Sequence, residues 1–322
     1  MSDITFGEQF LCCDKLIYGN NLLKLYTNLS VKLFDKASKN VFEKIKGKYG
    51  IIYDDFDYDN KIIDEWKKYD LSKIFIQSIR KKTITMDDKI EFHNVMSTSK
   101  FTPESYLDKS EVTDKEALYF VKDKGSVRGM GVTICDYDTL QNMDTTRCVI
   151  QKNIDNPDLH NERRYRIRQL ILLYNENIFI HKNSYFVLSN SKYDKDHTDL
   201  SDKHIIIGKG LKNNDLIQYD SCKKLDNFNL IYKNMIVALK DMKNYYDKEI
   251  NNISGNEYSI LGLDIIVDSD KNVQIIEINH RPAYRLHHHN VNLSNECQCS
   301  FIEDTILLLT TDDISLTKFD EV

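Results

Sequence analysis

One predicted hairpin carries the polar side chains with the strongest chemical signal in the chain. Residues 261–282 read LGLDIIVDSDKNVQIIEINHRP, and two β-branched runs flank a polar turn at 269–272. This pattern predicts a strand, a turn and a second strand. Pairing the strands symmetrically about the turn places Asp268 opposite Val273. The same register gives two further pairs, Asp264 with Glu277 and Gly262 with Asn279.

Asp264, Glu277 and Asn279 share one face of this hairpin, because successive side chains of a strand alternate between faces. Facing carboxylates about 5 Å apart repel each other, and a divalent cation between them reverses the sign of that energy. Two carboxylates and an amide oxygen are hard ligands that suit Mg²⁺ bound to phosphate oxygens, and Gly262 leaves room for a ligand. The other face carries the expected core residues, which are Ile265, Val267, Ile276 and Ile278. The alternative is a solvated face on which two acids meet by chance.

A glycine-rich turn follows a lysine in residues 118–134, LYFVKDKGSVRGMGVTI. Lys122 lies in a predicted strand, the turn contains Arg128, and a second strand begins at Val132. Glycines let backbone N–H groups approach phosphates closely, and a lysine supplies the counter-charge. The segment is not a P-loop, because GxxxxGK[ST] is absent and no helix follows the turn. A plain hairpin with a glycine turn is the alternative.

Two further predicted strands carry candidate binding groups. Residues 164–174, RYRIRQLILLY, begin with an alternating pattern that points three arginines to one face, namely Arg164, Arg166 and Arg168. Three like charges on one face repel unless anions lie there, and guanidinium groups match carboxylates and phosphates. The alternative is a row of exposed edge charges. Residues 148–154, CVIQKNI, predict a strand ending in Gln151 and Lys152, beside which backbone groups can bond a purine edge.

The remaining pattern predicts the elements that position these groups. Before residue 95, apolar spacing predicts a helix over 30–45, and apolar runs predict strands at 50–53 and 74–76. Residues 97–108 are polar and indicate a connection.

The C-terminal half is expected to supply the support for the hairpin. Residues 178–188 predict a strand pair, and the long polar stretch 190–227 predicts a lid or a mobile loop. The amphipathic stretch 228–250 predicts a helix beneath the central sheet. A last helix is expected at 302–309, and the acidic end 310–322 is expected to fray.

Composition excludes several classes of protein. The chain has 322 residues with 41% apolar and 29% charged residues, which is typical of a globular protein with a sizeable core. Its net charge of -6 argues against a nucleic-acid partner. There is no apolar run of about 18 residues and no signal-peptide pattern, so we expect a cytoplasmic protein with no membrane partner. The 7 cysteines are an odd number without secretory marks, so we expect reduced thiols.

A second metal-binding pattern is weaker. The residues after the hairpin include His280, Arg281, the run 287–289 of three histidines, Cys297 and Cys299. Their spacing matches no standard zinc pattern, and three adjacent histidines cannot all face one ion. We expect His280 and Arg281 to line the site and the others to lie on the surface or behind it.

Taken together, these segments resemble the ATP-grasp ligases, and among them the tubulin–tyrosine ligase-like family. Residues 122–132 resemble the family's lysine followed by its S-x-R-G-x-G-[IV] loop, with matches at Ser126, Arg128, Gly129, Gly131 and Val132. Residues 149–157 resemble V-x-Q-K-Y-I-x-N-P, and 164–168 resemble K-F-D-[IL]-R. Asp264, and Glu277 with Asn279, resemble the metal-binding G-x-D and E-x-N pair. The resemblance covers about residues 95 to 285.

Three departures concern the substrate positions. Arg166 stands where the family has an aspartate, and Asp123 stands where it usually has a proline. No arginine occurs from Lys182 to Lys192, where the family has one between two strand pairs, and residues 204–207 read HIII rather than H-L-T-N. ATP and metal binding therefore carry over better than the identity of the substrate.

The resemblance implies an α+β ATP-grasp fold in which two mixed or antiparallel-sheet lobes clasp ATP, preceded by a small α/β lobe. The implied boundaries are 1–95 for the N-terminal lobe, 96–190 for the central subdomain and 191–322 for the C-terminal subdomain with the hairpin. Lys122, Gln151 and Lys152 would hold the nucleotide, and residues 125–131 would cover its phosphates. Asp264, Glu277 and Asn279 would hold one or two Mg²⁺ ions.

The implied reaction is amide formation through an acyl phosphate, adding an amino acid to a protein or peptide, with Arg168, Arg166 and Lys122 as catalytic residues. An arginine at 166 suits an anionic acceptor, either an acidic peptide tail or a phosphorylated small molecule. Inositol phosphate kinases of the ATP-grasp class share the D…[DE]-x-N arrangement, so a small-molecule kinase is the alternative. A nucleotide-binding protein without turnover is a third reading, which the intact metal triad disfavours.

Overall fold

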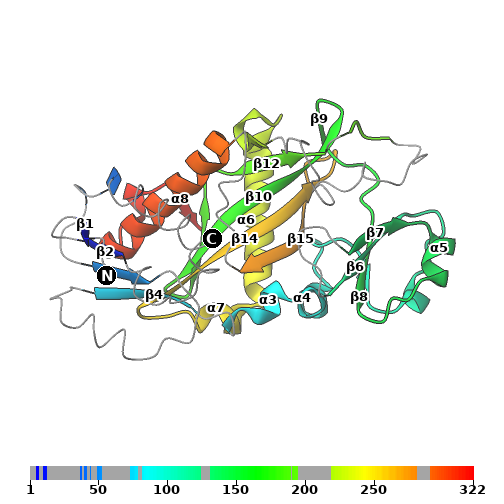
Figure 1. Cartoon of the computed structure of the whole chain (residues 1–322), viewed down its shortest axis with the longest axis horizontal. Coiled ribbons are helices and arrows are strands. Elements are labelled where there is room, and N and C mark those ends of the chain that lie inside the picture. Colours follow the sequence, from blue (N-terminus) through cyan, green and yellow to red (C-terminus); the bar gives the residue numbers. More distant parts are fainter. Residues whose placement is uncertain are drawn as a thin grey trace.

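The computed structural model describes residues 73–78, 82–124, 131–189, 191–194, 219–280 and 291–322, together with short pieces of residues 1–52. Its strands form two sheets, one of twelve strands and one of four (Figure 1). The large sheet contains β1 (Thr5–Phe6), β2 (Phe10–Cys12), β3 (Tyr49–Ile52), β4 (Lys73–Gln77), β9 (Leu159–His160), β10 (Arg163–Tyr174), β11 (Asn177–His181), β12 (Tyr185–Leu188), β13 (Tyr219–Ser221), β14 (Glu257–Val267), β15 (Val273–His280) and β16 (Phe319–Glu321). This is the α+β class with two sheets that the sequence predicts.

Strand β10 organises the large sheet. It pairs antiparallel with β14 over eight positions, and this register sets Arg168 opposite Asp264. Its other edge is shared by two short strands, because β12 pairs with residues 165–168 and β11 with residues 171–174. The strand pair expected at 178–188 is therefore wrong as a pair: both strands form, but each bonds to β10 rather than to the other. The alternating arginines and the long apolar run that follows them belong to one twelve-residue strand.

The β14–β15 hairpin has the predicted pairs at its functional end and a different register at its turn. Asp264 lies opposite Glu277 and Gly262 opposite Asn279, as predicted. At the turn, however, Val273 faces Val267 rather than Asp268, and a bulge between Asp264 and Ile265 absorbs the extra residue. The bulge also exchanges two isoleucines: Ile275 lies in the core at 0% exposure, whereas Ile276 is half-buried and lines a pocket.

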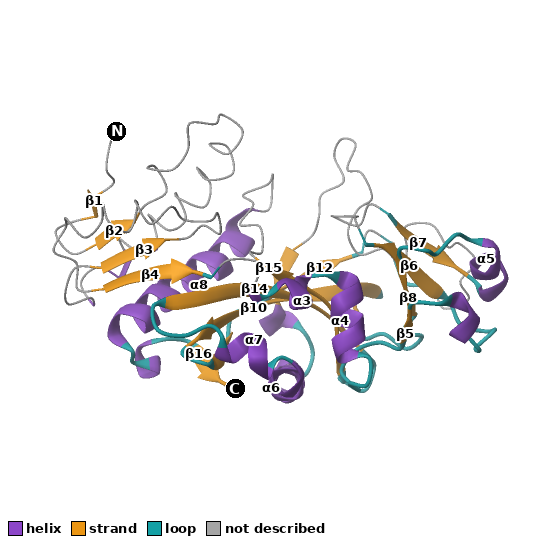
Figure 2. Ribbon diagram, turned by 90° about the horizontal axis from the view of Figure 1, so that it is seen from below, coloured by secondary structure: helices purple, strands orange, loops and turns teal. Residues whose placement is uncertain are grey.

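The strands predicted near residues 50 and 75 form as β3 and β4, and they are not a sheet of their own. They run parallel to each other, and β4 pairs parallel with β14, so they extend the large sheet (Figure 2). Ala37 and Val41 are helical and buried, in agreement with the helix expected over 30–45. Helices α3 (Ile84–Asp87) and α4 (Lys89–Met96) follow β4 and pack against β15.

Two helices cover opposite faces of the large sheet. Helix α6 (Phe228–Tyr245), continued by α7 (Asp247–Asn251), contacts the face carrying Ile171 and Leu173, whereas α8 (Val291–Thr311) contacts the face carrying Leu170 and Leu172 (Figure 2). The buried side of α6 is the predicted one and consists of Ile231, Met235, Ala238, Leu239 and Met242. In the described part of the chain, no helix combines the length and apolar character needed to cross a bilayer.

The small sheet is formed by β5 (Ser105–Tyr106), β6 (Tyr119–Asp123), β7 (Val132–Cys135) and β8 (Cys148–Lys152), in the order β5-β8-β6-β7. Helix α5 (Tyr137–Asn142) closes its core through Leu140. The predicted central subdomain, 96–190, is thus divided, since β5–β8 form this sheet while β9–β12 lie in the large one. The three domain boundaries stay predictions.

The chain's acidic end is folded, and the expected fraying is wrong. Strand β16 pairs with β11 and extends the large sheet. Phe319 is 3% exposed and lies edge-on to Phe301, with ring centroids 5.4 Å apart. One aromatic residue in an acidic segment gives no periodic signal, but its burial is sufficient to fix a three-residue strand.

Candidate active site

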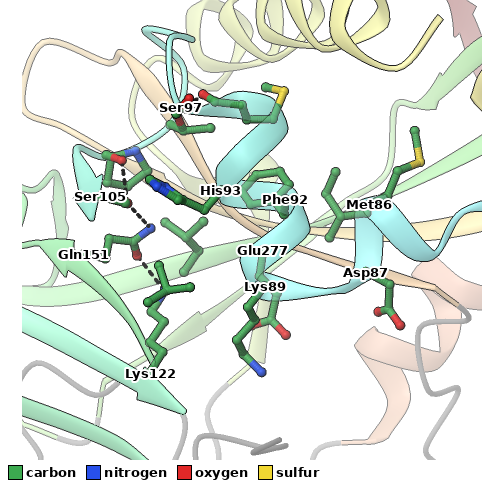
Figure 3. A pocket seen from close by; sticks show the side chains of 16 residues that line it. Met86, Asp87, Lys89, Phe92, His93, Ser97, Ser105, Lys122, Gln151 and Glu277 are labelled. Atoms are coloured by element: carbon green, nitrogen blue, oxygen red, sulfur yellow. Dashed lines mark hydrogen bonds between the residues drawn. The ribbon is translucent and has the colours of Figure 1, made fainter. Parts of the chain in front are cut away.

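A pocket lies where the open edge of β15 meets helices α3 and α4 and one face of the small sheet (Figure 3). Its polar and charged lining comes from all three parts and consists of Asp87, Lys89, His93, Ser97, Thr102, Ser105, Lys122, Gln151 and Glu277. Its apolar lining includes Phe92, Val149 and Ile276. The structure therefore brings together Lys122, Gln151 and Glu277, which are far apart in the sequence.

Lys122 and Gln151 lie on the pocket face of the small sheet. The register sets Phe120 opposite Gln151 and Lys122 opposite Val149, so these side chains share one face. Lys122 Nζ donates to Gln151 Oε1 at 2.5 Å, and Gln151 Nε2 donates to Ser105 Oγ at 3.4 Å (Figure 3). The pair holds the ammonium group at the pocket.

The pKa of Lys122 depends on charged groups of the large sheet and of helix α4 as well as on burial. Burial lowers the pKa of Lys122 to about 8, and the carboxylate of Glu277 acts against that lowering. Lys89 lowers the pKa further, whereas Asp264 raises it. An ammonium group with this pKa loses its proton slightly above neutral pH, and a bound anion would restore it.

Asp264 is held by two arginines of the neighbouring strand. Arg166 Nη1 lies 2.8 Å from Asp264 Oδ2, and Arg168 Nη2 donates to the same oxygen at 3.3 Å. Arg168 Nε lies 2.9 Å from Oδ1, although Oδ1 accepts no aligned hydrogen bond. Asp264 is 1% exposed and Arg166 is 8% exposed, so this is a buried cluster. The anion that faces Arg166 is a side chain of the protein itself.

The residues predicted to hold a cation fit that purpose in type and placement. Asp264, Glu277 and Asn279 share a face, and Asp264 Oδ1 is a buried oxygen without an aligned donor. Asn279 Nδ2 donates to the carbonyl of Gly262 at 3.5 Å, so its Oδ1 is the atom that a cation would take. Glu277 is half-buried and lines the pocket. An ion would have to share Asp264 with two guanidinium groups.

Arg164, the third arginine of the predicted row, contacts the small sheet instead. Its Nη1 donates to Asn153 Oδ1 at 2.9 Å, and its guanidinium carbon lies 6.0 Å from the ring centre of Phe120 and 5.7 Å from that of Tyr193. Arg164 is 3% exposed. The solvated-edge alternative is therefore wrong for this residue, which ties β10 to the small sheet.

The predicted nucleotide site also includes Lys152 and the glycine-rich loop. Lys152 lies on the face of β8 opposite Gln151 and forms an ion pair with Asp114 at 2.7 Å, so its side chain points away from the pocket. In the loop, Gly131 has a φ of 74°, a conformation in which glycine is unstrained. Ser126, Arg128 and Gly129 lie outside the described residues, and so does Arg281.

The sequence reasoning missed the contribution of α3 and α4. Lys89 and His93 line the pocket, and Asp87 Oδ1 accepts the backbone N–H of His280 at 3.0 Å. Residues 84–96 match no motif, so only the packing of α3 and α4 against β15 identifies these side chains. The available signal was an acid, a lysine and a histidine at successive spacings of two and four residues, namely Asp87, Lys89 and His93.

No zinc site is found in the described residues, which contain no metal-binding cluster of three His, Cys, Asp or Glu side chains. Cys297 and Cys299 are buried on α8, at 8% and 5% exposure, which excludes the surface among the two expected placements, on the surface or behind the site. Cys297 packs against Tyr185 and Val187. The described cysteines that can be assessed are free thiols: Cys135, Cys148, Cys222, Cys297 and Cys299.

Comparison with known proteins identifies the fold and the family. The crystal structure of the C-terminal domain of K. lactis Pby1, an ATP-grasp enzyme that interacts with the mRNA decapping enzyme Dcp2, superposes with a TM-score of 0.60 at 14% identity, covering 91% of this chain and 95% of that one. This likeness shows the ATP-grasp fold. No curated protein matches the sequence significantly. The tubulin-tyrosine ligase family model matches residues 64–253 and 213–314. Because these residues make up well over half of the chain, the protein is an ATP-grasp enzyme that belongs to the tubulin-tyrosine ligase family.

Proposed function

We propose that this enzyme is an ATP- and Mg²⁺-dependent ligase that adds an amino acid to a protein or peptide through an acyl phosphate. One observation carries the proposal: Lys122 of the small sheet and Glu277 of the large sheet line the same pocket, with Arg168 and Asp264 on the strands behind Glu277. A lysine, paired acids and an arginine around one cleft are the groups that phosphoryl transfer requires. A cytoplasmic location, where ATP is abundant, accompanies this proposal.

Lys122 would hold the phosphates of the nucleotide. Gln151 holds the Lys122 ammonium group in place through the 2.5 Å hydrogen bond. Lys152 contributes through its backbone at the end of β8, since its side chain pairs with Asp114. Val149 and Ile276 supply apolar surface for the base.

The cation site comprises Glu277, Asn279 and Asp264 Oδ1. These residues would hold Mg²⁺, which would supply neutralisation of the charge on the phosphate oxygens. Glu277 brings its carboxylate to the pocket side of the hairpin, and Asn279 supplies a neutral oxygen two residues later on the same face.

The chemistry proceeds in two displacements. A substrate carboxylate oxygen attacks the γ-phosphorus of ATP, the bond to the β–γ bridging oxygen breaks, and ADP leaves. An amine nitrogen then attacks the acyl carbon and loses a proton, and inorganic phosphate leaves as the amide forms. Arg168 is partly exposed, with a side-chain exposure of 16%, and it stabilises the negative charge that develops in both steps.

The kinase alternative keeps the shared D…[DE]-x-N arrangement but loses its second argument, the extra positive charge at Arg164 and Arg166. Both residues have partners within the protein, Asn153 and Asp264 respectively. For the same reason Arg166 does not call for an anionic acceptor. An acidic peptide tail or a phosphorylated acceptor stays a prediction without this support.

Product analysis tests the proposal. The enzyme is incubated with ATP, Mg²⁺, single amino acids and a peptide library, and ADP release is measured together with the peptide masses. We expect ADP release that depends on both an amino acid and a peptide, and a peptide mass increased by one amino-acid residue. ADP release accompanied by a mass increase of one phosphate would contradict the ligase proposal and restore the kinase. Glu277→Gln is the inactive control.

A further inference from the structure

Arg166 stands where the family motif has an aspartate, and it is bound to a predicted metal ligand. Its Nη1 lies 2.8 Å from Asp264 Oδ2, and Arg168 Nη2 reaches the same oxygen at 3.3 Å. A carboxylate oxygen has about two lone-pair positions, so both positions on Oδ2 are taken. Asp264 Oδ1 lies 2.9 Å from Arg168 Nε but accepts no aligned hydrogen bond, so it is the oxygen of Asp264 that a cation would share with Arg168.

Within the group formed by Arg166, Arg168, Asp264 and Glu277, the fixed charges are balanced. Arg166 and Arg168 contribute two positive charges, and Asp264 and Glu277 contribute two negative charges. An aspartate at position 166 would give three carboxylates against one guanidinium, an excess of two negative charges. That excess equals the charge of one divalent cation.

Burial keeps Arg166 on Asp264. Arg166 is 8% exposed and Asp264 is 1% exposed. A guanidinium that gave up its partner to an incoming ion would be left as an uncompensated buried charge, which is strongly unfavourable. Burial lowers the pKa of Arg166 and the carboxylates of Asp264 and Glu277 act against this lowering, so both acids influence its charge.

We infer that Arg166 takes the place of a second divalent cation, so that the site holds a single ion with its nucleotide. This inference rests on the proposed function in one respect only, the binding of ATP with a metal ion at this pocket. Arg166 is a positioning residue in this account. It neutralises Asp264 permanently, and it lowers the affinity of the site for further cations.

Counting bound Mn²⁺ tests the inference without turnover. The full chain is mixed with an equal amount of an ATP analogue that has a nitrogen bridge between the β- and γ-phosphates, and Mn²⁺ is titrated in. The electron paramagnetic resonance signal of free Mn²⁺ gives the number of ions bound. We expect one ion per chain for the natural sequence and two for Arg166→Asp.

A milder variant and a matched control keep the result interpretable. Arg166→Gln removes the charge but keeps a polar side chain of similar reach, and we expect it to bind Mn²⁺ about tenfold more tightly than the natural sequence. Arg164→Gln is the matched control. It removes a buried guanidinium from the same face of β10, but one that donates to Asn153 and not to Asp264. We expect it to bind one ion with an affinity within about twofold of the natural sequence.

Two results would overturn the inference. One is two Mn²⁺ ions per chain in the natural sequence. The other is unchanged stoichiometry and affinity in every Arg166 variant that folds. The proposed function has a separate readout, because a chain that binds two ions and still forms an amide would refute the role of Arg166 and leave the ligase standing. A chain that binds one ion and transfers phosphate to its acceptor would support the role of Arg166 and refute the ligase proposal.

Discussion

Two buried clusters that each contain an aspartate lie on the large sheet, and they differ in their surroundings. At one, Asp264 accepts from Arg166 and Arg168 beside the pocket that Glu277 and Lys122 line. At the other, His181 Nε2 lies 2.9 Å from Asp304 Oδ2, and the histidine ring is 0% exposed.

The second cluster is closed by its neighbours. The ring of His181 lies edge-on to Phe301 and Phe319, with centroids 5.6 Å and 5.2 Å away. Asp304 Oδ2 also accepts the backbone N–H of Lys318 at 2.9 Å, so the cluster joins β11, α8 and β16.

The comparison separates two uses of buried charge. The His181 cluster satisfies its groups internally and fastens the chain's last strand, so its loss should cost stability. The Asp264 cluster borders a pocket and includes an oxygen without an aligned donor, so changes beside it should cost turnover. Each prediction below tests this division.

The largest effect is expected for Glu277→Gln. Removing this carboxylate takes away a cation ligand and should reduce turnover at least about a thousandfold. The free energy of unfolding of the ligand-free protein should change little, because Glu277 is half-buried and the substitution keeps the shape of the side chain. Steady-state ADP release and urea unfolding measure the two quantities. A large loss of stability would place Glu277 in the structural class instead.

Asp304→Ala should give the opposite result. Breaking a buried pair by removing one partner leaves the other group uncompensated, and we expect the free energy of unfolding to fall by about 3 kcal/mol. Turnover per folded molecule should be unchanged. The control is Lys192→Ala, which removes an exposed partner of Glu162 and should leave the free energy of unfolding nearly unchanged. Normal stability with lost turnover in Asp304→Ala would refute the purely structural role of the His181–Asp304 cluster.

A pH profile sharpens the role of Lys122. Its pKa is lowered to about 8, so the ammonium group is charged below pH 8 and loses its proton above it. The value of kcat/KM for ATP reports the free enzyme, and it should fall up to about tenfold per pH unit above 8. Lys122→Arg stays charged and should remove this decline. A profile that is unchanged in the arginine variant would assign the titration to another group.

The smallest effect separates the two lysines of the sequence motif. Saturating ATP with Mg²⁺ should raise the melting temperature, because a ligand that binds only the native state stabilises it. Lys122→Ala should shrink that shift, since a charge-assisted contact contributes about 1.5–3 kcal/mol. Lys152→Ala should leave it nearly intact, because Lys152 pairs with Asp114 on the other face. Equal losses in both variants would mean that the side chain of Lys152 turns to the nucleotide.

The sequence sufficed for the paired positions of the hairpin but not for its turn. Alternation and a symmetric turn predicted Asp264 opposite Glu277, and this pair is confirmed. The bulge beside Asp264 is a local irregularity with no sequence marker such as glycine, and it moved Ile276 from the core to the pocket. The predicted turn register was wrong by one residue and the bulge was not predicted, and these two errors cancelled at the functional end of the hairpin.

The rest of the site depends on packing between distant segments. Helices α3 and α4 reach the pocket because they lie against β15, and no periodicity in residues 84–96 indicates that contact. The partner of Arg166 was equally hidden. The charge reversal was evident from the sequence, but the facing anion proved to be Asp264, which the antiparallel register of β10 and β14 sets beside it.

A crystal structure with the nitrogen-bridged ATP analogue and Mn²⁺ would locate the nucleotide and the ion. We expect the γ-phosphate within hydrogen-bond distance of Lys122 Nζ, the ion bound to Glu277 and Asn279, and Arg166 still on Asp264. A nucleotide bound away from this pocket, with its phosphates beyond the reach of Lys122, would contradict the account.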